Sequence, residues 1–388
     1  MPMDNPLQIR MNSLDILRGW CMIAILFFHS QMYYFGTDVV PYTLYVPNAL
    51  ALFYFISGFL AYREQQPVKT AMKRIALRLI MPYFIFATSI SIVKMLIYFG
   101  TIDFRVLGSM VLSGRASWFV AALIIIELLF LVVRKITQDN TWGILLVALI
   151  SVVGSYFLQR SPVIDTNFEN GIPFALPPAL VGLFFYCIGF LYHRHMLPCI
   201  PKPTSMGYVQ RDGDEHRQLP SRAFTITYSW LIPTLVLFLI VKLFEAQKGY
   251  GFLFASLYAD PFALFILDML LGCVGISSLL LLLWQDTYMV EQDNSLKSKK
   301  ESIYWFMSPA WIGMHCMVFY FFSGGVPLVV AFVLKKYVFS PDHHNTWCFD
   351  MGFWFTFLAV IVITSTIAWV IYRYLPFLLG RKVRVYDK

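Results

Sequence analysis

The sequence predicts an all-α polytopic membrane protein with about ten transmembrane helices and both termini cytoplasmic. Three observations predict this class. Hydrophobic residues make up 59% of the 388-residue chain and charged residues only 13%, about half the charged share of a typical soluble protein. Apolar runs of about 20 residues, the length that crosses a bilayer as a helix, recur along the whole chain. Most of the 30 lysine and arginine residues fall on one side when these runs are counted in order, as expected for cytoplasmic loops.

The apolar runs follow one another with short polar breaks. We place the predicted spans at residues 12–35, 47–62, 75–99, 117–134, 141–158, 174–192, 225–244, 261–284, 302–322 and 350–374. The stretch 324–339 is also apolar, but it is short and contains two glycines, a proline and two lysines. We interpret it as a re-entrant or interfacial segment, with eleven spans as the alternative.

Local signals support the individual spans in order. Ser57-Gly58, near the end of the second run, is typical of close helix packing. The third run has basic residues at its inner mouth and contains Pro82, which we expect to kink it. Trp118-Phe119 opens the fourth run as an interfacial aromatic belt does. The remaining runs are identified by length and apolar content.

We interpret residues 1–388 as a single membrane domain. Polar segments near 193–224 and 285–301 interrupt the apolar pattern and are expected to be cytoplasmic loops. No internal repeat has a convincing period, which counts against a transporter built from inverted repeats.

The net charge of +8 is explained by membrane topology, so we expect no nucleic-acid partner. The six cysteines are scattered and predict neither a metal site nor a disulfide framework.

The first span carries the most informative pattern. Arg18 stands at its mouth, and His29 lies eleven residues further along. At ~100° per residue, eleven steps return to within roughly 20° of the starting direction, so Arg18, Met22, Ile25 and His29 form one stripe about 16 Å long. Asp15 extends the stripe by one turn. An ionisable residue inside a membrane marks a functional site, and a neutral imidazole can take a proton from a hydroxyl and return it.

Further arginines suggest a site for phosphate groups. Arg74 and Arg78 are four residues apart, and hence on one helix face, at the inner mouth of the third span. The pair alone is explained by ordinary positive-inside charge. Together with Arg18, the two arginines would form a cytoplasmic cluster that binds phosphates, which arginine contacts in bidentate fashion. Ser57 and Gly58 would let a thin ligand come close, with helix packing as the alternative.

Other ionisable side chains lie within the predicted spans. Glu127 falls near the middle of the fourth span without a partner nearby in the sequence. Either Asp15 or Glu127 is a candidate to orient the His29 imidazole. Lys94 and Lys242 lie near the outer ends of their spans, where a lysine can extend to the membrane surface. The further intramembrane candidates are His315, Asp268 and Trp118.

Three classes of function fit these residues. The first is an enzyme that uses the arginine–histidine stripe for acyl transfer. The alternative is a proton-coupled transporter with a relay formed by His29, Glu127, Asp268 and His315. The third is a membrane sensor or assembly factor. Acyl transfer to an acceptor hydroxyl would identify the enzyme, and solute uptake or export without such transfer would identify the transporter.

The motifs resemble those of the bacterial integral-membrane type-3 acyltransferase family, which acylates cell-surface sugars. The resemblance covers most of the chain, and its most specific part lies in the first hundred residues. The matching segments are Leu14-Asp15-Ile16-Leu17-Arg18-Gly19 leading to His29, Phe55-Ile56-Ser57-Gly58-Phe59-Leu60, Lys73-Arg74-Ile75-Ala76-Leu77-Arg78-Leu79-Ile80-Met81-Pro82-Tyr83, Ser117-Trp118-Phe119, Ser308-Pro309-Ala310-Trp311-Ile312-Gly313-Met314-His315 and Phe377-Leu378-Leu379-Gly380-Arg381-Lys382.

The resemblance implies a multi-pass O-acyltransferase of the inner cell membrane, most simply an O-acetyltransferase. It implies a catalytic His29, with Arg18, Arg74 and Arg78 serving the acyl donor. We expect no permanently bound cofactor and no metal. The donor substrate would be acetyl-CoA, with succinyl-CoA or another acyl-CoA as alternatives. The acceptor would be a hydroxyl of a cell-surface or lipid-linked glycan, so the expected partners are acyl-CoA, that glycan and the lipid bilayer.

Overall fold

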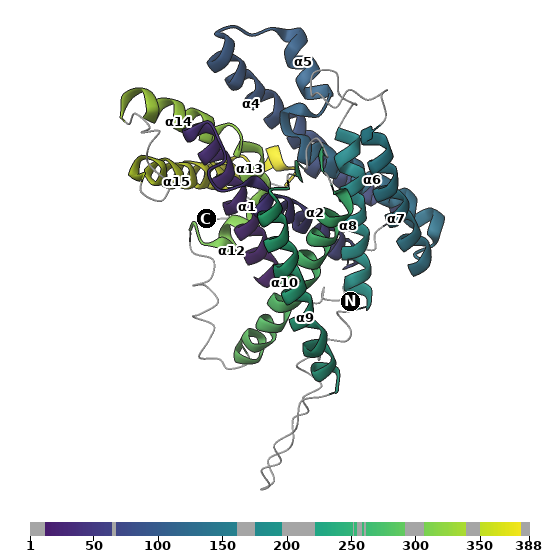
Figure 1. Cartoon of the computed structure of the whole chain (residues 1–388). Coiled ribbons are helices and arrows are strands. Elements are labelled where there is room, and N and C mark those ends of the chain that lie inside the picture. The colour runs from purple at the N-terminus through teal and green to yellow at the C-terminus, as the bar shows by residue number, and fades with distance from the viewer. Residues whose placement is uncertain are drawn as a thin grey trace.

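The computed structural model describes residues 12–63, 67–160, 175–195, 222–250, 252–253, 258–259, 261–291, 306–338 and 350–381. These residues are almost entirely helical (Figure 1). Nine of the described helical segments are long and apolar enough to cross a membrane, and a bent helix pair makes up to ten. The predicted class, an all-α polytopic membrane protein, is therefore confirmed.

The helical elements follow the predicted spans closely up to residue 291. The elements that make up the nine candidate membrane spans are α1 (Asn12–Phe35), α2 (Val46–Arg63), α3 (Val68–Ile75), the π-helical turn η2 (Ala76–Ile80), α4 (Met81–Phe99), α6 (Trp118–Thr137), α7 (Thr141–Arg160), α8 (Leu176–His195), α9 (Arg222–Lys248), α10 (Phe262–Glu291) and α15 (Met351–Tyr374), where α3, η2 and α4 together form one span. The short elements are η1 (Tyr42–Leu44), α5 (Phe104–Leu112), η3 (Arg115–Ser117), α12 (Pro309–Met314), α13 (Cys316–Phe322), α14 (Val326–Tyr337), η8 (Pro376–Leu379) and a two-stranded hairpin of β1 (Phe252–Leu253) and β2 (Tyr258–Ala259).

The late part of the chain differs from the expected pattern. In place of one continuous span at 302–322, α12 and α13 are separated at His315, whose backbone has φ −107°. The apolar stretch expected to be re-entrant or interfacial forms α14, which is bent by 50° from α13. Gly324 and Gly325 occupy the bend, where helix-forming preference is low. The predicted loops near 193–224 and 285–301 lie mainly outside the described residues.

Two pairs of glycines bring the central helices into backbone contact. A Cβ atom on Gly19 of α1 would lie 1.7 Å from the Pro309 carbonyl oxygen, and one on Gly313 of α12 would lie 1.7 Å from the Asp15 carbonyl oxygen. Gly58 on α2 and Gly189 on α8 form the second pair, in which each glycine meets the backbone of the other helix in the same way. These contacts are the membrane mode of packing, in which small residues let helix backbones approach closely.

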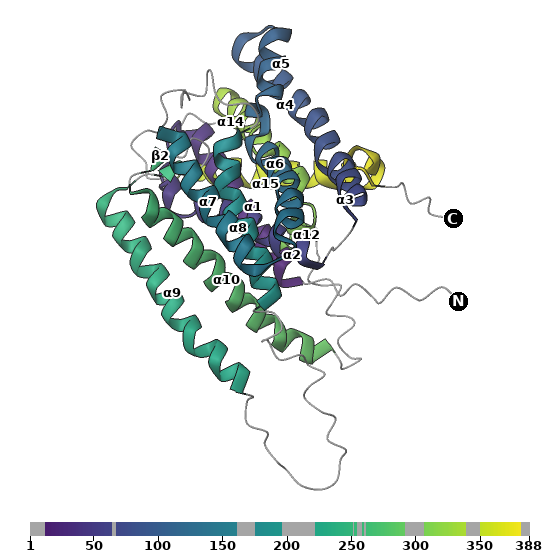
Figure 2. The same cartoon turned by 90° about the vertical axis from the view of Figure 1, so that its right-hand side faces the viewer.

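The outer helices present apolar side chains to the surroundings. Phe157 on α7 is 67% exposed, and Ile232 and Leu243 on α9 are 64% and 65% exposed. Figure 2 shows α9 as the outermost element, lying along α10 on one side of the bundle. A soluble protein rarely exposes contiguous apolar surface of this kind, so these faces are suited to contact lipid tails.

Candidate functional site

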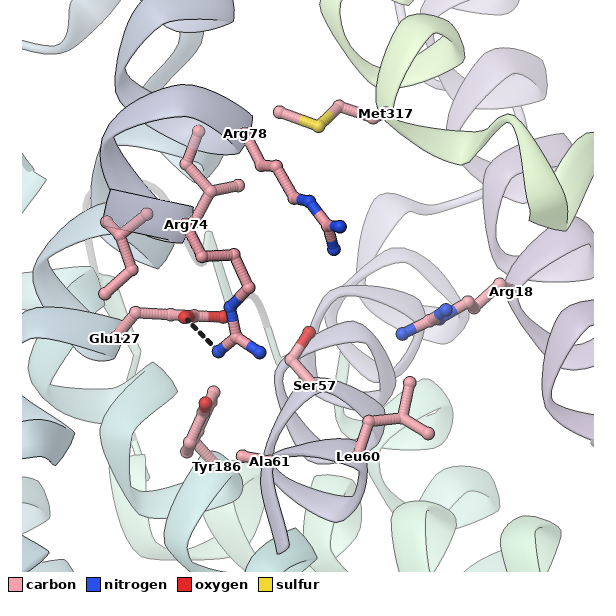
Figure 3. A pocket seen from close by; sticks show the side chains of 11 residues that line it. Arg18, Ser57, Leu60, Ala61, Arg74, Arg78, Glu127, Tyr186 and Met317 are labelled. Atoms are coloured by element: carbon pink, nitrogen blue, oxygen red, sulfur yellow. Dashed lines mark ion pairs between the residues drawn. The ribbon is translucent and has the colours of Figure 1, made fainter. Parts of the chain in front are cut away.

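A polar pocket of about 240 Å³ lies where α1, α2 and the α3–η2 segment meet. Its walls come from α1, α2, the α3–η2 segment, α6, α8 and α13, which are spread widely along the sequence (Figure 3). The lining residues are Arg18, Ser57, Leu60, Ala61, Arg74, Ile75, Arg78, Leu79, Glu127, Tyr186 and Met317. The structure therefore brings together the three arginines that the sequence singled out.

The π-helical turn η2 places two of these arginines. Arg74 lies in the last turn of α3, and Arg78 lies within η2. Pro82 follows in the first turn of α4, and a proline has no N–H to donate to the carbonyl four residues earlier. A wider π turn accommodates this loss without ending the helix, and such turns are frequent at functional sites. Gly380, with φ +63°, lies so close to the Leu77 carbonyl that a Cβ would be 2.2 Å from its oxygen, so the C-terminal turn supports η2.

The arginines differ in how they are held. Arg74 forms an ion pair with Glu127, with its Nη2 atom 3.6 Å from Oε2, and both side chains are about four-fifths buried. The Nε atom of Arg18 is buried without a hydrogen-bond partner among the described residues. Arg78 is exposed, and Figure 3 shows its guanidinium and that of Arg18 pointing into the space above Ser57.

The pocket's charge favours an anion. Three guanidinium groups face one carboxylate, so the lining carries a net positive charge when all four groups are ionised. Buried N–H groups without acceptors are costly and are satisfied when an acceptor enters. Arginine offers a planar array of donors that matches phosphate oxygens. The pocket is therefore suited to bind phosphate groups.

His29 lies at the other end of the same helix. Because α1 is continuous from Asn12 to Phe35, the separation of eleven positions between Arg18 and His29 corresponds to about 16 Å along the axis. Met22 and Ile25 between them are fully buried or nearly so, so the stripe faces the protein. The half-buried His29 ring stacks on Tyr33 with centroids 6.2 Å apart.

Lys94 lies beside His29 and was not expected there. The charges of the two side chains are close enough to interact. A Cβ on Gly324 would lie 3.2 Å from the Lys94 Nζ atom, so the ammonium group sits at the break between α13 and α14. The sequence places Lys94 near the end of a span but does not reveal that the broken helix crosses there.

The other candidate residues occupy different positions. Asp15 is buried one turn before Arg18, about 21 Å from His29 along α1, which is too far for a hydrogen bond between the two side chains. Ser57 lines the pocket, and its hydroxyl donates to the Phe53 carbonyl at 2.8 Å. Gly58 contacts the α8 backbone beside the pocket. Glu127 is in the pocket with Arg74, at the end of α1 opposite to His29.

Two candidates lie away from the pocket lining. His315 hydrogen-bonds through Nδ1 to the Trp311 carbonyl at 2.7 Å and stacks on the Trp311 ring at 4.1 Å. Trp118 begins α6, and its ring packs edge-on against Phe119 at 6.0 Å. Both positions are consistent with helix packing.

A buried ionic cluster joins α9, α10 and α2. The Lys242 ammonium lies 2.6 Å from Asp268 Oδ2 and 3.2 Å from Glu245 Oε2, and it donates to the Thr43 carbonyl at 3.0 Å. Asn48 donates to the same Asp268 oxygen at 3.0 Å. The sequence suggested that Lys242 extends to the surface, whereas its side chain is only 12% exposed. The i, i+3 spacing of Lys242 and Glu245 was the one signal of this pairing.

The four residues of the suggested proton relay are engaged separately. Glu127 pairs with Arg74, Asp268 with Lys242, and His315 with the backbone of its own helix. His29 stacks on Tyr33. Each of these contacts is with a residue outside the suggested relay, so they give the relay no support.

Comparison with known proteins gives one match. The family model described as an acyltransferase domain matches residues 11–373 of the chain. Nothing among the curated proteins matches the chain, and no solved structure matches it. The matched region contains every helix that contributes to the pocket, together with His29.

Proposed function

The chain belongs to the type-3 acyltransferase family, and from this premise we propose that it is a membrane O-acyltransferase. The donor is an acyl-CoA, most simply acetyl-CoA, and the acceptor is a hydroxyl of a cell-surface or lipid-linked glycan. Family membership supports the reaction class. The choice of donor rests on the cationic lining of the pocket, and the choice of acceptor rests on the family resemblance.

The observation that carries the proposal is the convergence of Arg18, Arg74 and Arg78 on one pocket. Coenzyme A bears several phosphate groups at one end and the thioester at the other, joined by the long pantetheine arm. A cationic pocket at one end of α1 would hold the phosphates. The arm would then run along the α1 stripe toward His29, which lies about 16 Å deeper.

His29 acts as the general base in this proposal. The imidazole accepts the proton of the acceptor hydroxyl while the hydroxyl oxygen attacks the thioester carbonyl carbon. The tetrahedral intermediate collapses as the carbon–sulfur bond breaks, and the imidazolium returns the proton to the leaving thiolate. The products are the acylated sugar and free coenzyme A, and His29 ends neutral.

The residues around the three arginines act on the donor-binding site in this proposal. Glu127 holds Arg74 in place through the ion pair and so acts on the donor site rather than on the imidazole. Asp15, buried one turn from Arg18, belongs to the same end of α1. Gly58 acts through helix packing, since it brings α2 against α8 beside Ser57.

The membrane arrangement fits a cytosolic donor. With both termini cytoplasmic, the Arg18 end of α1 faces the cytosol, where acyl-CoA is made. His29 then lies toward the outer half of the bilayer. We propose the inner membrane as the location, because a surface glycan would be reached from the His29 end of α1.

An acyl-transfer assay tests this function. The protein, purified in detergent, is mixed with acetyl-CoA and glycan extracted from the host envelope, and free thiol is measured over time. We expect thiol release that depends on the glycan, together with an acetyl mass increment on the sugar. Solute movement in sealed vesicles without thiol release would instead support the transporter and contradict the proposal.

A further inference from the structure

A second, largely apolar cavity of about 500 Å³ lies between the end of α7 and the start of α10. Its walls are aliphatic and aromatic side chains together with one cation. The principal lining residues are Val152, Val153, Tyr156, Arg160, Phe262 and Ile266. None of these residues lines the arginine pocket described above.

Arg160 is held in a defined place at this cavity. Its Cζ atom lies 3.9 Å from the centroid of the Tyr156 ring, so the guanidinium rests on the aromatic face. Tyr156 in turn packs against Phe262 of α10, with ring centroids 5.5 Å apart. Within the described ranges, no carboxylate forms an ion pair with Arg160. A guanidinium stacked on a ring keeps its N–H edge available to an anion.

The cavity faces the lipid at the end of the bundle opposite to the arginine pocket. Successive helices alternate in direction, and α6 reaches the arginine-pocket end near Arg134 before α7 returns from it. Arg160, at the end of α7, is therefore on the opposite face. Val153 in the cavity lining is 53% exposed, and Phe157, whose ring packs against Tyr156 of the lining, is 67% exposed, so the groove is open sideways to acyl chains.

A basic residue on this face has no role in topology. Lysine and arginine direct loops to the cytoplasmic side, and the proposed orientation puts Arg160 on the other side. An arginine at the rim of an apolar groove complements the two parts of an anionic phospholipid. The cation can contact the charged headgroup, and the apolar lining can contact the hydrocarbon tail. Aromatic residues such as Tyr156 are enriched at the headgroup level of membranes.

We propose that the α7–α10 groove is a binding site for an anionic phospholipid. The lipid phosphate contacts Arg160, and one acyl chain lies along Val152, Val153 and Ile266. This site is separate from the proposed catalytic site and does not depend on the acyltransferase activity. The charge complementarity selects an anionic headgroup, and the apolar lining selects a lipid over a soluble phosphate.

The test measures lipids that stay bound to the purified protein. The protein is reconstituted in nanodiscs of equal parts phosphatidylglycerol and phosphatidylcholine, released into mild detergent and analysed by native mass spectrometry. For Arg160→Gln we expect the bound phosphatidylglycerol to fall by about fivefold relative to phosphatidylcholine, the factor that corresponds to ~1 kcal/mol for one basic residue near a membrane surface.

Two further variants define the outcome. Arg105→Gln, at an exposed position on α5, removes the same charge elsewhere and is expected to retain the lipid. Val153→Trp fills the groove without changing its charge and is expected to displace the lipid. Equal retention of both lipids by the unaltered protein would overturn the proposal. Competition by glycerol phosphate, which has no acyl chain, would overturn the lipid as the occupant.

Discussion

At the scale of single residues, the surroundings of each arginine decide what it can do. Arg134 donates to both carboxylate oxygens of Asp139 at 2.8 and 2.9 Å. These hydrogen bonds lower the pKa of the Asp139 carboxyl below its usual range, so Arg134 is neutralised by a permanent partner. Arg18 has a buried Nε atom without an acceptor, and Arg78 is exposed at the pocket. Of these three arginines, Arg18 and Arg78 are therefore the two poised to receive a new anion.

The Arg78→Gln variant tests this difference. We expect the KM for acetyl-CoA to rise by about tenfold to a hundredfold with little change in kcat, because charge-assisted hydrogen bonds contribute ~1.5–3 kcal/mol. Lys69→Gln, which removes an exposed cation on neighbouring α3, serves as the control and should leave KM within about twofold. An unchanged KM in the Arg78 variant would remove this residue from the donor site. Steady-state thiol release measures both parameters.

Single residues also gave the clearest signals of a candidate site in the sequence. Arg18, Arg74, Arg78 and His29 stand out because a charge or an imidazole is rare in or beside a membrane span. The partner of Arg74 could not be predicted, since Glu127 is on another helix and no local spacing links the two. Lys94 was also missed, because its contact with Gly324 is set by the crossing of two distant helices.

At the scale of elements, glycine contacts hold the central helices at backbone distance. For Gly19→Ala we expect a lower melting temperature in detergent, because the new Cβ would lie 1.7 Å from the Pro309 carbonyl oxygen. Overpacking of this kind costs at least ~1–3 kcal/mol. Gly154→Ala on α7 is the matched control, because a Cβ there meets nothing within 4 Å and alanine favours the helix. Equal melting temperatures for the two variants would contradict this packing.

A second prediction at this scale concerns the contribution of the buried cluster around Lys242 to stability. Lys242→Met would leave Asp268, which is fully buried, without its cation. Loss of one partner of a buried ion pair costs about 3–5 kcal/mol. We therefore expect a clear loss of thermal stability, partly restored when Asp268→Asn is added. Lys248→Met, at the exposed end of α9, should have little effect. Thermal unfolding of the four proteins in one detergent gives the comparison.

The elements themselves could be predicted where a span is one continuous helix. Composition and length located α1, α2, α6 and α7 within a few residues. They did not locate the break at His315, because α12 is positioned by the contact of Gly313 with α1 rather than by its own sequence. The bend at Gly324 and Gly325 left a signal in the sequence, but its angle of 50° depends on neighbouring helices.

At the scale of the whole molecule, the arginine pocket and the α7–α10 groove lie at opposite ends of the bundle. In the proposed orientation, the arginine pocket faces the cytosol and the α7–α10 groove lies in the outer leaflet. Cysteine labelling tests it in a cysteine-depleted chain. Thr101→Cys, in the loop after α4, should react with an impermeant thiol reagent in intact spheroplasts, and Lys135→Cys, at the end of α6, only after permeabilisation. The reverse pattern would place the arginine pocket outside the cell and away from acyl-CoA.

The central claim is that donor binding and acyl transfer take place at two separate positions on α1. The donor binds at Arg18, and the transfer takes place at His29, about 16 Å further along the helix. Measuring both coenzyme A affinity and thiol release for His29→Ala tests it most directly. We expect acetyl-CoA to bind within about threefold of the unaltered affinity while turnover falls by at least about 100-fold, the contribution of a general base. Full turnover in this variant would contradict the account.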